Sequence, residues 1–524
     1  MDRKKFLKYL GLGSAVATLP SALLACSSEA KEGFVLPQNA FTQPLVFPEE
    51  IRANDFELVA ESTQKTLAGD APSDIYTLNG ALPSPTIRIK RGQSLNINFQ
   101  NRITQESILH WHGLIVPPAM DGHPKDAVQP GQNYNYRFNV DQRAGTYWYH
   151  PHPDQLTGPQ VYRGLGGFFI VEDDEEQALG LPSGDRELPL IVQDKQFNSS
   201  GQLTYNIGRM DRMMGFFGNT LLVNGRPAPY HKVSTNWHRL RLLNGSNARI
   251  LDFSFSDGHA FHVIGGDGGL LEQPHEISSV MLAPGERADL LVDFSRYEKG
   301  QKVRMQAEAQ NGGGGMMDMM DGNRNGGMMD MMDGNRNGGM MNGRQSRRGM
   351  QGMMGDRDRR GSTSGGEADI LEFRIAKEKQ EEFELPGRLA KRSYPDASAA
   401  DRSRRINLTM EMMQGPAING KFFEMMRVDQ KVPQGALEVW EFTNNTMMPM
   451  PHPMHIHATQ FNVLERSGGE LSPHERGWKD TVLVGAGETV RVLTKFDAPK
   501  GLYVFHCHNL EHEDNGMMAN FEIT

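Results

Sequence analysis

The stretch His506-Cys507-His508 constrains the chain most, because Cys507 is one of only two cysteines. His512 and Met517 follow Cys507 at offsets of five and ten residues. A cysteine thiolate, a histidine and a nearby methionine thioether are the soft ligands that hold a blue, electron-transferring copper, with the methionine as weak axial ligand. The motif therefore predicts one copper centre built around Cys507.

The two histidines beside this cysteine predict a second metal centre. Side chains alternate between the two faces of a strand, so His506 and His508 would both point away from the side taken by Cys507. Two imidazoles on the opposite face could serve a different metal, joined to the first by a few covalent bonds. A solvated histidine-rich turn is the alternative for this motif alone.

Three further clusters contain the His-x-His spacing: His110-Trp111-His112, His150-Pro151-His152 and His452-Pro453-Met454-His455-Ile456-His457. The four clusters and His512 together hold ten of the 17 histidines. A single His-x-His is weak evidence, because a surface strand often carries one. Four of them in one chain, one wrapped around a cysteine, are hard to explain as solvated surface.

In order and spacing these motifs resemble those of multicopper oxidases, and the chain is most similar to the bacterial cuprous oxidases and laccase-like metallo-oxidases of the periplasm. Segments 220–225 and 239–245 share the resemblance. It implies an all-β fold of three cupredoxin-like Greek-key β-barrel domains, at about 45–176, 185–376 and 400–524. The trinuclear copper cluster would lie between the first and third domains. Short alternating runs between turn signals independently favour an all-β architecture.

The resemblance also implies four copper ions and their ligands. The type 1 copper would be held by His452, Cys507 and His512, with Met517 axial on the family spacing although Met518 is adjacent. The type 2 copper would be bound by His110 and His455. The type 3 pair would take the remaining imidazoles: His112, His150, His152, His457, His506 and His508.

Oxygen reduction at such a cluster consumes protons, and the resemblance implies acidic residues beside it. Asp121 and Glu513 stand at the matching positions. General acid work by a carboxyl group needs a pKa raised toward the working pH by burial. The alternatives are an ordinary turn at Asp121-Gly122 and an ordinary surface charge at Glu513.

The N-terminus predicts export to the periplasm. A basic start precedes the apolar stretch 6–25, which is broken by glycine and proline and is typical of a signal peptide, here 1–26. Residues 3–8 resemble a twin-arginine signal with lysine in the second arginine position. Residues 23–26 resemble a lipobox, so a lipid anchor at Cys26 is expected, with simple cleavage as the alternative.

A methionine-rich insertion at 311–366 departs from a plain oxidase. The twelve residues 314–325 repeat at 326–337, and the insertion contains 13 of the 31 methionines. Such glycine-rich and asparagine-rich composition cannot bury a core, and strand-like sequence returns at 370–375. Neutral thioethers favour Cu(I), so the insertion is predicted to collect Cu(I) within the second domain. The alternative is a loop grown by repeat expansion.

Further methionines precede His452. In the cuprous-oxidase relatives, a substrate-copper site uses a methionine two residues before this histidine and an aspartate four residues before it. Met450 matches the methionine, whereas Met448 stands where the aspartate would be. Met448 and Met450 are therefore predicted ligands of a substrate copper, with core packing as the alternative.

The favoured function is a periplasmic oxidase that converts Cu(I) to Cu(II) and reduces dioxygen to water in copper tolerance. A laccase acting on phenols is the alternative enzyme, and a copper-free structural or partner-binding relative in the cell envelope is an alternative of another class. A two-domain copper nitrite reductase is disfavoured, because it would leave His506 and His508 without a use. The net charge is −9 and no basic block points to nucleic acid. A monomer is expected.

Overall fold

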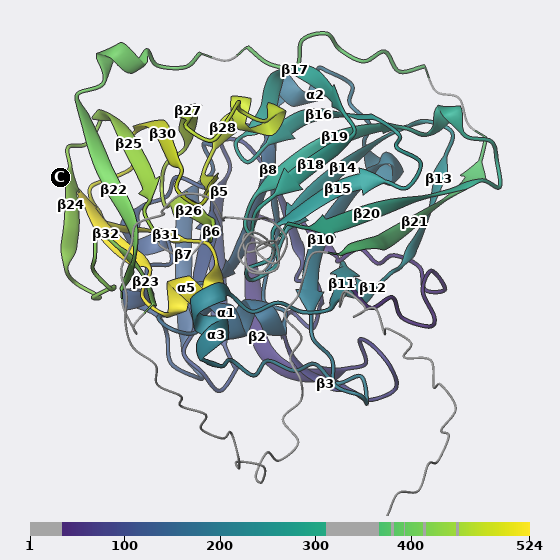
Figure 1. The fold of residues 1–524 in the computed structure, drawn as a ribbon, viewed down its shortest axis with the longest axis horizontal. Coiled ribbons are helices and arrows are strands. Elements are labelled where there is room, and N and C mark those ends of the chain that lie inside the picture. Colours follow the sequence, from purple (N-terminus) through teal and green to yellow (C-terminus); the bar gives the residue numbers. More distant parts are fainter. Residues whose placement is uncertain (1–33, 311–365, 379–381, 392, 412–414, 447–449) are drawn as a thin grey trace, which may run out of the picture.

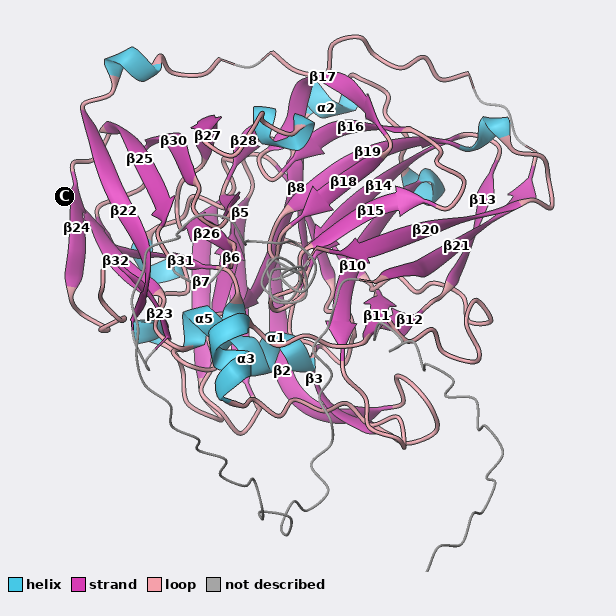
Figure 2. Cartoon of the chain, in the orientation of Figure 1, coloured by secondary structure: helices cyan, strands magenta, loops and turns pink. Residues whose placement is uncertain are grey.

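The computed structural model describes residues 34–310, 366–378, 382–391, 393–411, 415–446 and 450–524. Over these residues the chain is mostly β, as predicted, and it forms six sheets, two in each third of the chain (Figures 1 and 2). The predicted signal peptide with Cys26, almost all of the predicted methionine-rich insertion, and Met447 and Met448 lie outside the described residues.

The first domain packs a five-stranded sheet against a four-stranded sheet. The five-stranded sheet has the order β1 (Glu50–Ile51), β4 (Thr86–Lys90), β9 (Gly167–Glu172), β8 (Gly145–Pro151) and β6 (Leu109–His112). The other sheet has the order β3 (Ser73–Leu78), β2 (Asp55–Lys65), β5 (Ser94–Asn101) and β7 (Asn133–Asn139). Alternate residues of β5, namely Leu95, Ile97 and Phe99, enter the core between the sheets, as period-two burial requires.

The second domain pairs a seven-stranded with a five-stranded sheet. The larger sheet has the order β12 (Arg226–Pro227), β11 (Thr220–Val223), β10 (Glu187–Lys195), β14 (Trp237–Asn244), β19 (Arg287–Asp293), β16 (Phe261–Gly266) and β17 (Gly269–Ile277). The smaller has the order β13 (Tyr230–Ser234), β21 (Glu367–Lys377), β20 (Lys302–Ala309), β15 (Leu251–Phe255) and β18 (Ser279–Leu282). Strands β20 and β21 are antiparallel neighbours, so the segment 311–366 joins two adjacent strand ends.

The third domain pairs a six-stranded with a five-stranded sheet. The first has the order β23 (Gly415–Ile418), β22 (Arg402–Glu411), β25 (Leu437–Asn444), β30 (Thr489–Lys495), β27 (Phe461–Arg466) and β28 (Trp478–Lys479). The second has the order β24 (Val428–Val432), β32 (Met518–Ile523), β31 (Gly501–Cys507), β26 (His452–Ile456) and β29 (Thr481–Val484). Trp440 and Phe521 lie in the core between them.

Helices are short and lie at the domain junctions. The α-helices described are α1 (Thr157–Arg163), α2 (Asp174–Gln177), α3 (Arg209–Met214) and α5 (Leu510–Asp514). The 3-10 turns are η1 (Pro118–Met120), η2 (Pro124–Asp126), η3 (Gly184–Arg186), η4 (Phe294–Arg296), η6 (Ala397–Ala399) and η7 (Pro473–Arg476). Helix α5 contacts both α1 and α3, and the three gather in the lower part of Figure 1.

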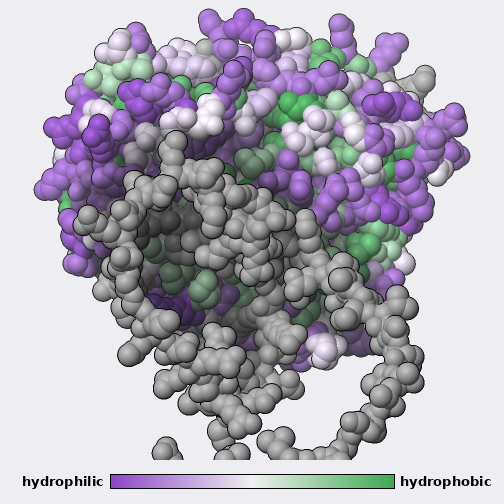
Figure 3. Space-filling model, viewed as in Figure 1, coloured by the Kyte–Doolittle hydropathy of each residue, from purple (hydrophilic) through white to green (hydrophobic). Residues whose placement is uncertain are grey.

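A half-buried carboxyl group ties the first domain to the third at this junction. Asp514 at the end of α5 accepts hydrogen bonds from the backbone N–H groups of Thr157 and Gly158, each at 2.9 Å. These are orphan donors at the start of α1, which a carboxylate satisfies well. None of the described helices is long and apolar enough to span a membrane. The face in Figure 3 is mostly hydrophilic where it is not grey.

The loop that contains Asp121 and Gly122 packs closely against β6. Two glycines allow the tightness of this packing to be tested. Gly122 has a φ of 81°, and a Cβ atom there would lie 2.3 Å from the carbonyl oxygen of Leu109. Gly131 has a similar φ of 80°, with nothing within 4 Å of such a Cβ.

We expect Gly122→Ala to lower the melting temperature much more than Gly131→Ala. Gly131→Ala adds only left-handed backbone strain, of about 1–2 kcal/mol. Gly122→Ala adds a clash with the backbone of β6 to the same strain. Thermal unfolding of the two variants measures the difference, and equal shifts would mean that the loop moves away from β6 without resistance.

Candidate copper centres

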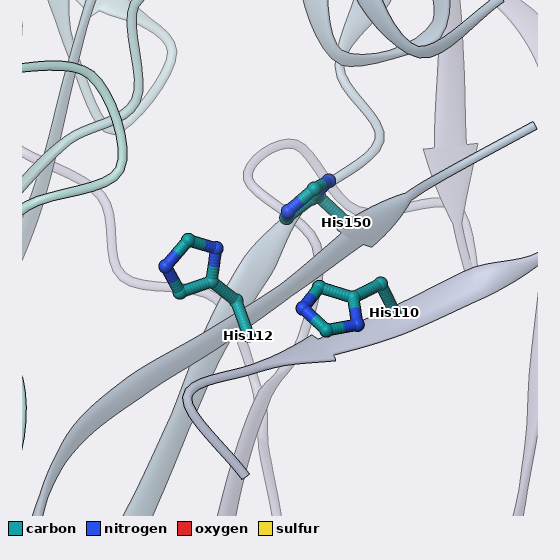
Figure 4. A group of neighbouring side chains, drawn as sticks. All are labelled: His110, His112 and His150. Atoms are coloured by element: carbon teal, nitrogen blue, oxygen red, sulfur yellow. The ribbon is translucent and has the colours of Figure 1, made fainter. Parts of the chain in front are cut away.

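In strand β6, burial of the neighbouring residues in the core determines which way the histidine side chains point. Leu109 and Trp111 lie in the core of the first domain, so His110 and His112 emerge on the opposite face of the strand. His150 stands opposite His110 on the neighbouring strand β8. Figure 4 shows the rings of His110, His112 and His150 turned toward one shared space.

Strand β31 repeats this arrangement in the third domain. Phe505 and Cys507 lie in the core of that domain, whereas His506 points from the other face. His506 is paired with His455 on the neighbouring strand β26. Alternation therefore separates the thiol from the imidazoles on each side of it.

The thiol of Cys507 is the centre of a first group of donors. Its Sγ lies 3.5 Å from Nδ1 of His452 on β26 and 3.6 Å from Nδ1 of His512 in α5. All three side chains are fully buried. Met517 belongs to the same core cluster as Cys507, whereas the adjacent Met518 does not, which favours Met517 as the fourth donor.

A second group joins imidazoles from the two ends of the chain. It consists of eight fully buried histidines: His110, His112, His150, His152, His455, His457, His506 and His508. His110 Nε2 lies 3.3 Å from His455 Nε2, across 345 residues of sequence. His506 Nε2 lies 3.1 Å from His457 Nε2 and 3.2 Å from His152 Nε2. The first and third domains thus meet at the histidines, as the sequence predicts.

Burial favours the uncharged form of seven of these imidazoles, because a buried cation loses its hydration. It lowers the pKa of the following residues: His110, His112, His150, His152, His455, His457 and His508. The pKa of His150 falls to about 4 and that of His152 to about 3. Burial likewise lowers the pKa of His512 to about 4 and raises that of the Cys507 thiol. A soft cation would displace the thiol proton.

Hydrogen bonds show that the imidazole cluster suits metal ions. His110 Nδ1 lies 2.7 Å from the carbonyl oxygen of Asp121, and His455 Nδ1 lies 2.8 Å from that of Asp480. A carbonyl oxygen only accepts, so both Nδ1 atoms carry the ring proton. The two Nε2 atoms, 3.3 Å apart, then face each other with lone pairs. Such lone pairs repel unless a cation lies between them, so the residues fit a bound metal.

The two predicted proton-handling carboxyl groups lie beside the cluster with opposite pKa shifts. Asp121 Oδ2 lies 2.8 Å from His457 Nδ1, and burial raises the pKa of Asp121 well above its ordinary value. Glu513 Oε2 lies 3.1 Å from His506 Nδ1. Burial acts to raise the pKa of Glu513, but His506 and His152 outweigh it and lower that pKa. The raised pKa expected of both groups is therefore found at Asp121 alone.

A third carboxylate at the cluster, that of Asp480, is not predicted from the sequence. Asp480 Oδ1 lies 2.9 Å from His112 Nε2 and accepts a hydrogen bond of 2.8 Å from Arg287 Nη1. Arg287 comes from β19 of the second domain, and both groups are fully buried. Asp480 stands in no histidine motif. Only the packing of the third domain against the first brings it to His112, and the second domain holds it there through Arg287.

Of the two methionines predicted to bind a substrate copper, Met450 is described and Met448 is not. Met450 is 3% exposed, and its carbonyl oxygen accepts a hydrogen bond of 2.7 Å from Asn444 Nδ2. The buried position of Met450 also suits core packing, the alternative stated above.

Comparison with known proteins agrees with this geometry. Three family models described as multicopper oxidase match residues 59–176, 181–312 and 397–524. The multicopper oxidase mco of Staphylococcus aureus is 32% identical over 454 residues, which cover 86% of this chain and 84% of that protein. The chain belongs to the multicopper oxidase family.

Two other relatives span nearly the whole chain. Cell division protein FtsP of Sodalis glossinidius is 31% identical, over 100% of this chain and 98% of its own. The crystal structure of the McoA multicopper oxidase from the hyperthermophile Aquifex aeolicus is 35% identical, with a TM-score of 0.76, over 92% of this chain and 99% of its own.

Family membership makes the chain a dioxygen-reducing oxidoreductase with three cupredoxin domains. The group of His452, Cys507 and His512 is consistent with a type 1 copper site, and the eight imidazoles are consistent with a trinuclear one.

We expect Cys507→Ser to abolish the blue absorption band and to remove one copper ion, because a serine hydroxyl is a poor ligand for soft copper. Cys26→Ser is the matched control and should keep both. Metal analysis and the visible spectrum of the two variants measure the outcome. A blue band in the Cys507→Ser protein would place the blue centre elsewhere.

Proposed function

We propose that this multicopper oxidase is an exported cuprous oxidase, which oxidises Cu(I) to Cu(II), reduces dioxygen to water and so contributes to copper tolerance. The choice of substrate rests on one observation, namely that helix α3 covers the imidazole of His512. Its Nε2 lies 3.1 Å from the carbonyl oxygen of Met213, at the end of α3. The carbonyl only accepts, so Nε2 carries the proton and Nδ1 faces Cys507 Sγ with its lone pair.

A covered imidazole disfavours large reductants. The ring of His512 is fully buried, and its outer N–H is already donated to Met213. A phenol would have to displace this segment to touch the ring, whereas a small ion can give its electron from the surface of the covering helix. The closed site therefore supports Cu(I) over the laccase alternative.

The ligand roles follow the sequence prediction. We assign His452, Cys507, His512 and Met517 to the type 1 copper, and His110 with His455 to the type 2 copper. The type 3 pair takes the other six imidazoles: His112, His150, His152, His457, His506 and His508. When bound, copper supplies one-electron acceptance at the thiolate and four-electron reduction of dioxygen at the imidazoles. Cys507 and its two neighbours in sequence join the centres through one segment of backbone.

The carboxyl groups divide the handling of protons. Burial raises the pKa of Asp121, so its carboxyl group keeps a proton at pH values where an exposed aspartate has lost it. It lies 2.8 Å from His457 and is positioned as a general acid toward the cluster. Glu513, whose pKa is lowered, stays ionised and orients His506.

The similarity to FtsP supports the alternative that the chain is a copper-free, partner-binding protein and not an enzyme. The imidazoles of His110 and His455 argue against this role. Their Nε2 atoms lie 3.3 Å apart in a fully buried interface, with their lone pairs facing each other. A protein without copper would gain nothing from this repulsion between its own domains. The retained donor set therefore supports an oxidase.

The substrate is tested by oxygen uptake of the copper-loaded protein with Cu(I) and with a phenol. We expect faster turnover with Cu(I). Removal of 311–365 is expected to lower the Cu(I) rate far more than the phenol rate, because the insertion supplies thioethers that select Cu(I). A short turn can close the gap, since the N–H of Ala309 donates to the carbonyl oxygen of Gly366 at 3.1 Å. A wild-type preference for phenol would move the assignment to laccase.

The role of Asp121 predicts a pH dependence. Its carboxyl group loses the proton as pH rises through its raised pKa, so the rate of oxygen reduction should fall in that range. Asp121→Asn cannot donate, and we expect a rate lower by on the order of 10²–10⁴-fold that no longer follows this titration. The rate is measured by mixing reduced enzyme rapidly with dioxygen at each pH.

Glu424→Gln is the control for this experiment, because Glu424 is 70% exposed on the surface of the third domain. It should keep the wild-type pH profile. An unchanged profile in Asp121→Asn would assign the proton to another group.

A further inference from the structure

Helix α3 carries three methionines at positions that are exposed or only partly buried. Met210, Met213 and Met214 have the spacing i, i+3 and i+4, which places them on one face of the helix. Met210 is 62% exposed, and Met213 and Met214 are only half-buried. Core packing therefore does not account for Met210, and it leaves parts of Met213 and Met214 open to solvent.

The helix is held firmly against the type 1 centre. The Met213 carbonyl accepts from His512 Nε2 at 3.1 Å, and the Met214 carbonyl accepts from Asn509 Nδ2 at 3.4 Å. Gly215 then ends the helix at a φ of 99°, where a Cβ atom would lie 2.3 Å from Ala248 Cβ. The three thioethers therefore lie within one helical turn of the Met213 carbonyl group, which is hydrogen-bonded to the predicted type 1 ligand His512.

The other side chains of α3 exclude a site for hard cations. Arg209 and Arg212 are exposed and positively charged. Asp211 Oδ2 accepts a hydrogen bond of 2.6 Å from the N–H of Gly208 and so caps the start of the helix. Neutral sulfur is thus the main donor type that α3 offers, and thioether sulfur selects Cu(I).

We propose that Met210, Met213 and Met214 form a Cu(I)-binding site on α3, separate from the insertion 311–366 and from Met448 and Met450. The proposal rests on Cu(I) being the substrate. Cu(I) held by the thioethers gives one electron to the oxidised type 1 centre, along the backbone of Met213 and its hydrogen bond to His512. The ion leaves as Cu(II), which prefers nitrogen and oxygen donors. No proton moves in this step.

Binding is tested with Ag(I), which shares the charge and soft-ligand preference of Cu(I) and gives up no electron here. Ag(I) is added to the full-length, copper-loaded enzyme, which is kept fully reduced in the absence of oxygen. The methionine methyl groups are labelled with ¹³C, and their NMR signals are recorded. Single Met→Leu substitutions assign the signals. We expect Ag(I) to shift the signals of Met210, Met213 and Met214 together.

The control signal is Met281, which is 38% exposed on β18 of the second domain and should not move. If the three α3 signals stay in place at saturating Ag(I), the site does not exist. Shifts of Met281 equal to those of α3 would likewise overturn the proposal, because they would mean that Ag(I) binds any exposed methionine.

Turnover provides a second readout. In the double variant Met213→Leu/Met214→Leu, the backbone carbonyl that meets His512 is retained, and the blue absorption band reports whether the type 1 centre is intact. We expect the ratio of Cu(I) to phenol kcat/KM to fall by at least about tenfold, as loss of metal affinity at a site commonly does. Met281→Leu should leave the ratio unchanged.

The two proposals fail in different ways. A wild-type enzyme that prefers phenols would overturn the cuprous oxidase function, whatever Ag(I) does at α3. A wild-type enzyme that prefers Cu(I), with an unchanged ratio in the double variant, would overturn the α3 site alone.

Discussion

The facing of imidazole lone pairs across the interface between the first and third domains is the constraint on which the rest of the structure depends. Backbone carbonyls fix the proton of His110 and His455 on Nδ1, so their Nε2 atoms meet 3.3 Å apart without a hydrogen bond. The repulsion has to be overcome by docking of the two domains. Asp514, which caps α1 from the end of α5, contributes to that docking.

No imidazole or thiol from the described residues of the second domain lies in either centre, yet this domain shapes both. Arg287 reaches Asp480, which contacts His112. A Cβ atom on Gly285 would lie 3.0 Å from the ring of His508, so glycine is needed where the second domain passes this imidazole. Helix α3 covers His512 from the same domain. The middle domain therefore positions the imidazoles and limits what can reach them.

Much of the site could be predicted because its pattern is local. In β6 and β31, the residues next to the imidazoles are those that the cores bury, so alternation alone separates Cys507 from His506. The opposite pKa shifts of Asp121 and Glu513 were not predictable. They depend on which imidazoles stand nearby, and two acidic letters in a sequence do not carry that information.

The sequence by itself determined the donor types, their order along the chain and the mostly β architecture, since strand periodicity and ligand chemistry act over a few residues. Tertiary structure alone decided which imidazoles from opposite ends of the chain share a space. It also decided that Asp480 joins them and that the Met213 carbonyl takes the outer N–H of His512. These contacts link residues hundreds of positions apart, and only the packing of three domains brings such residues within hydrogen-bonding distance.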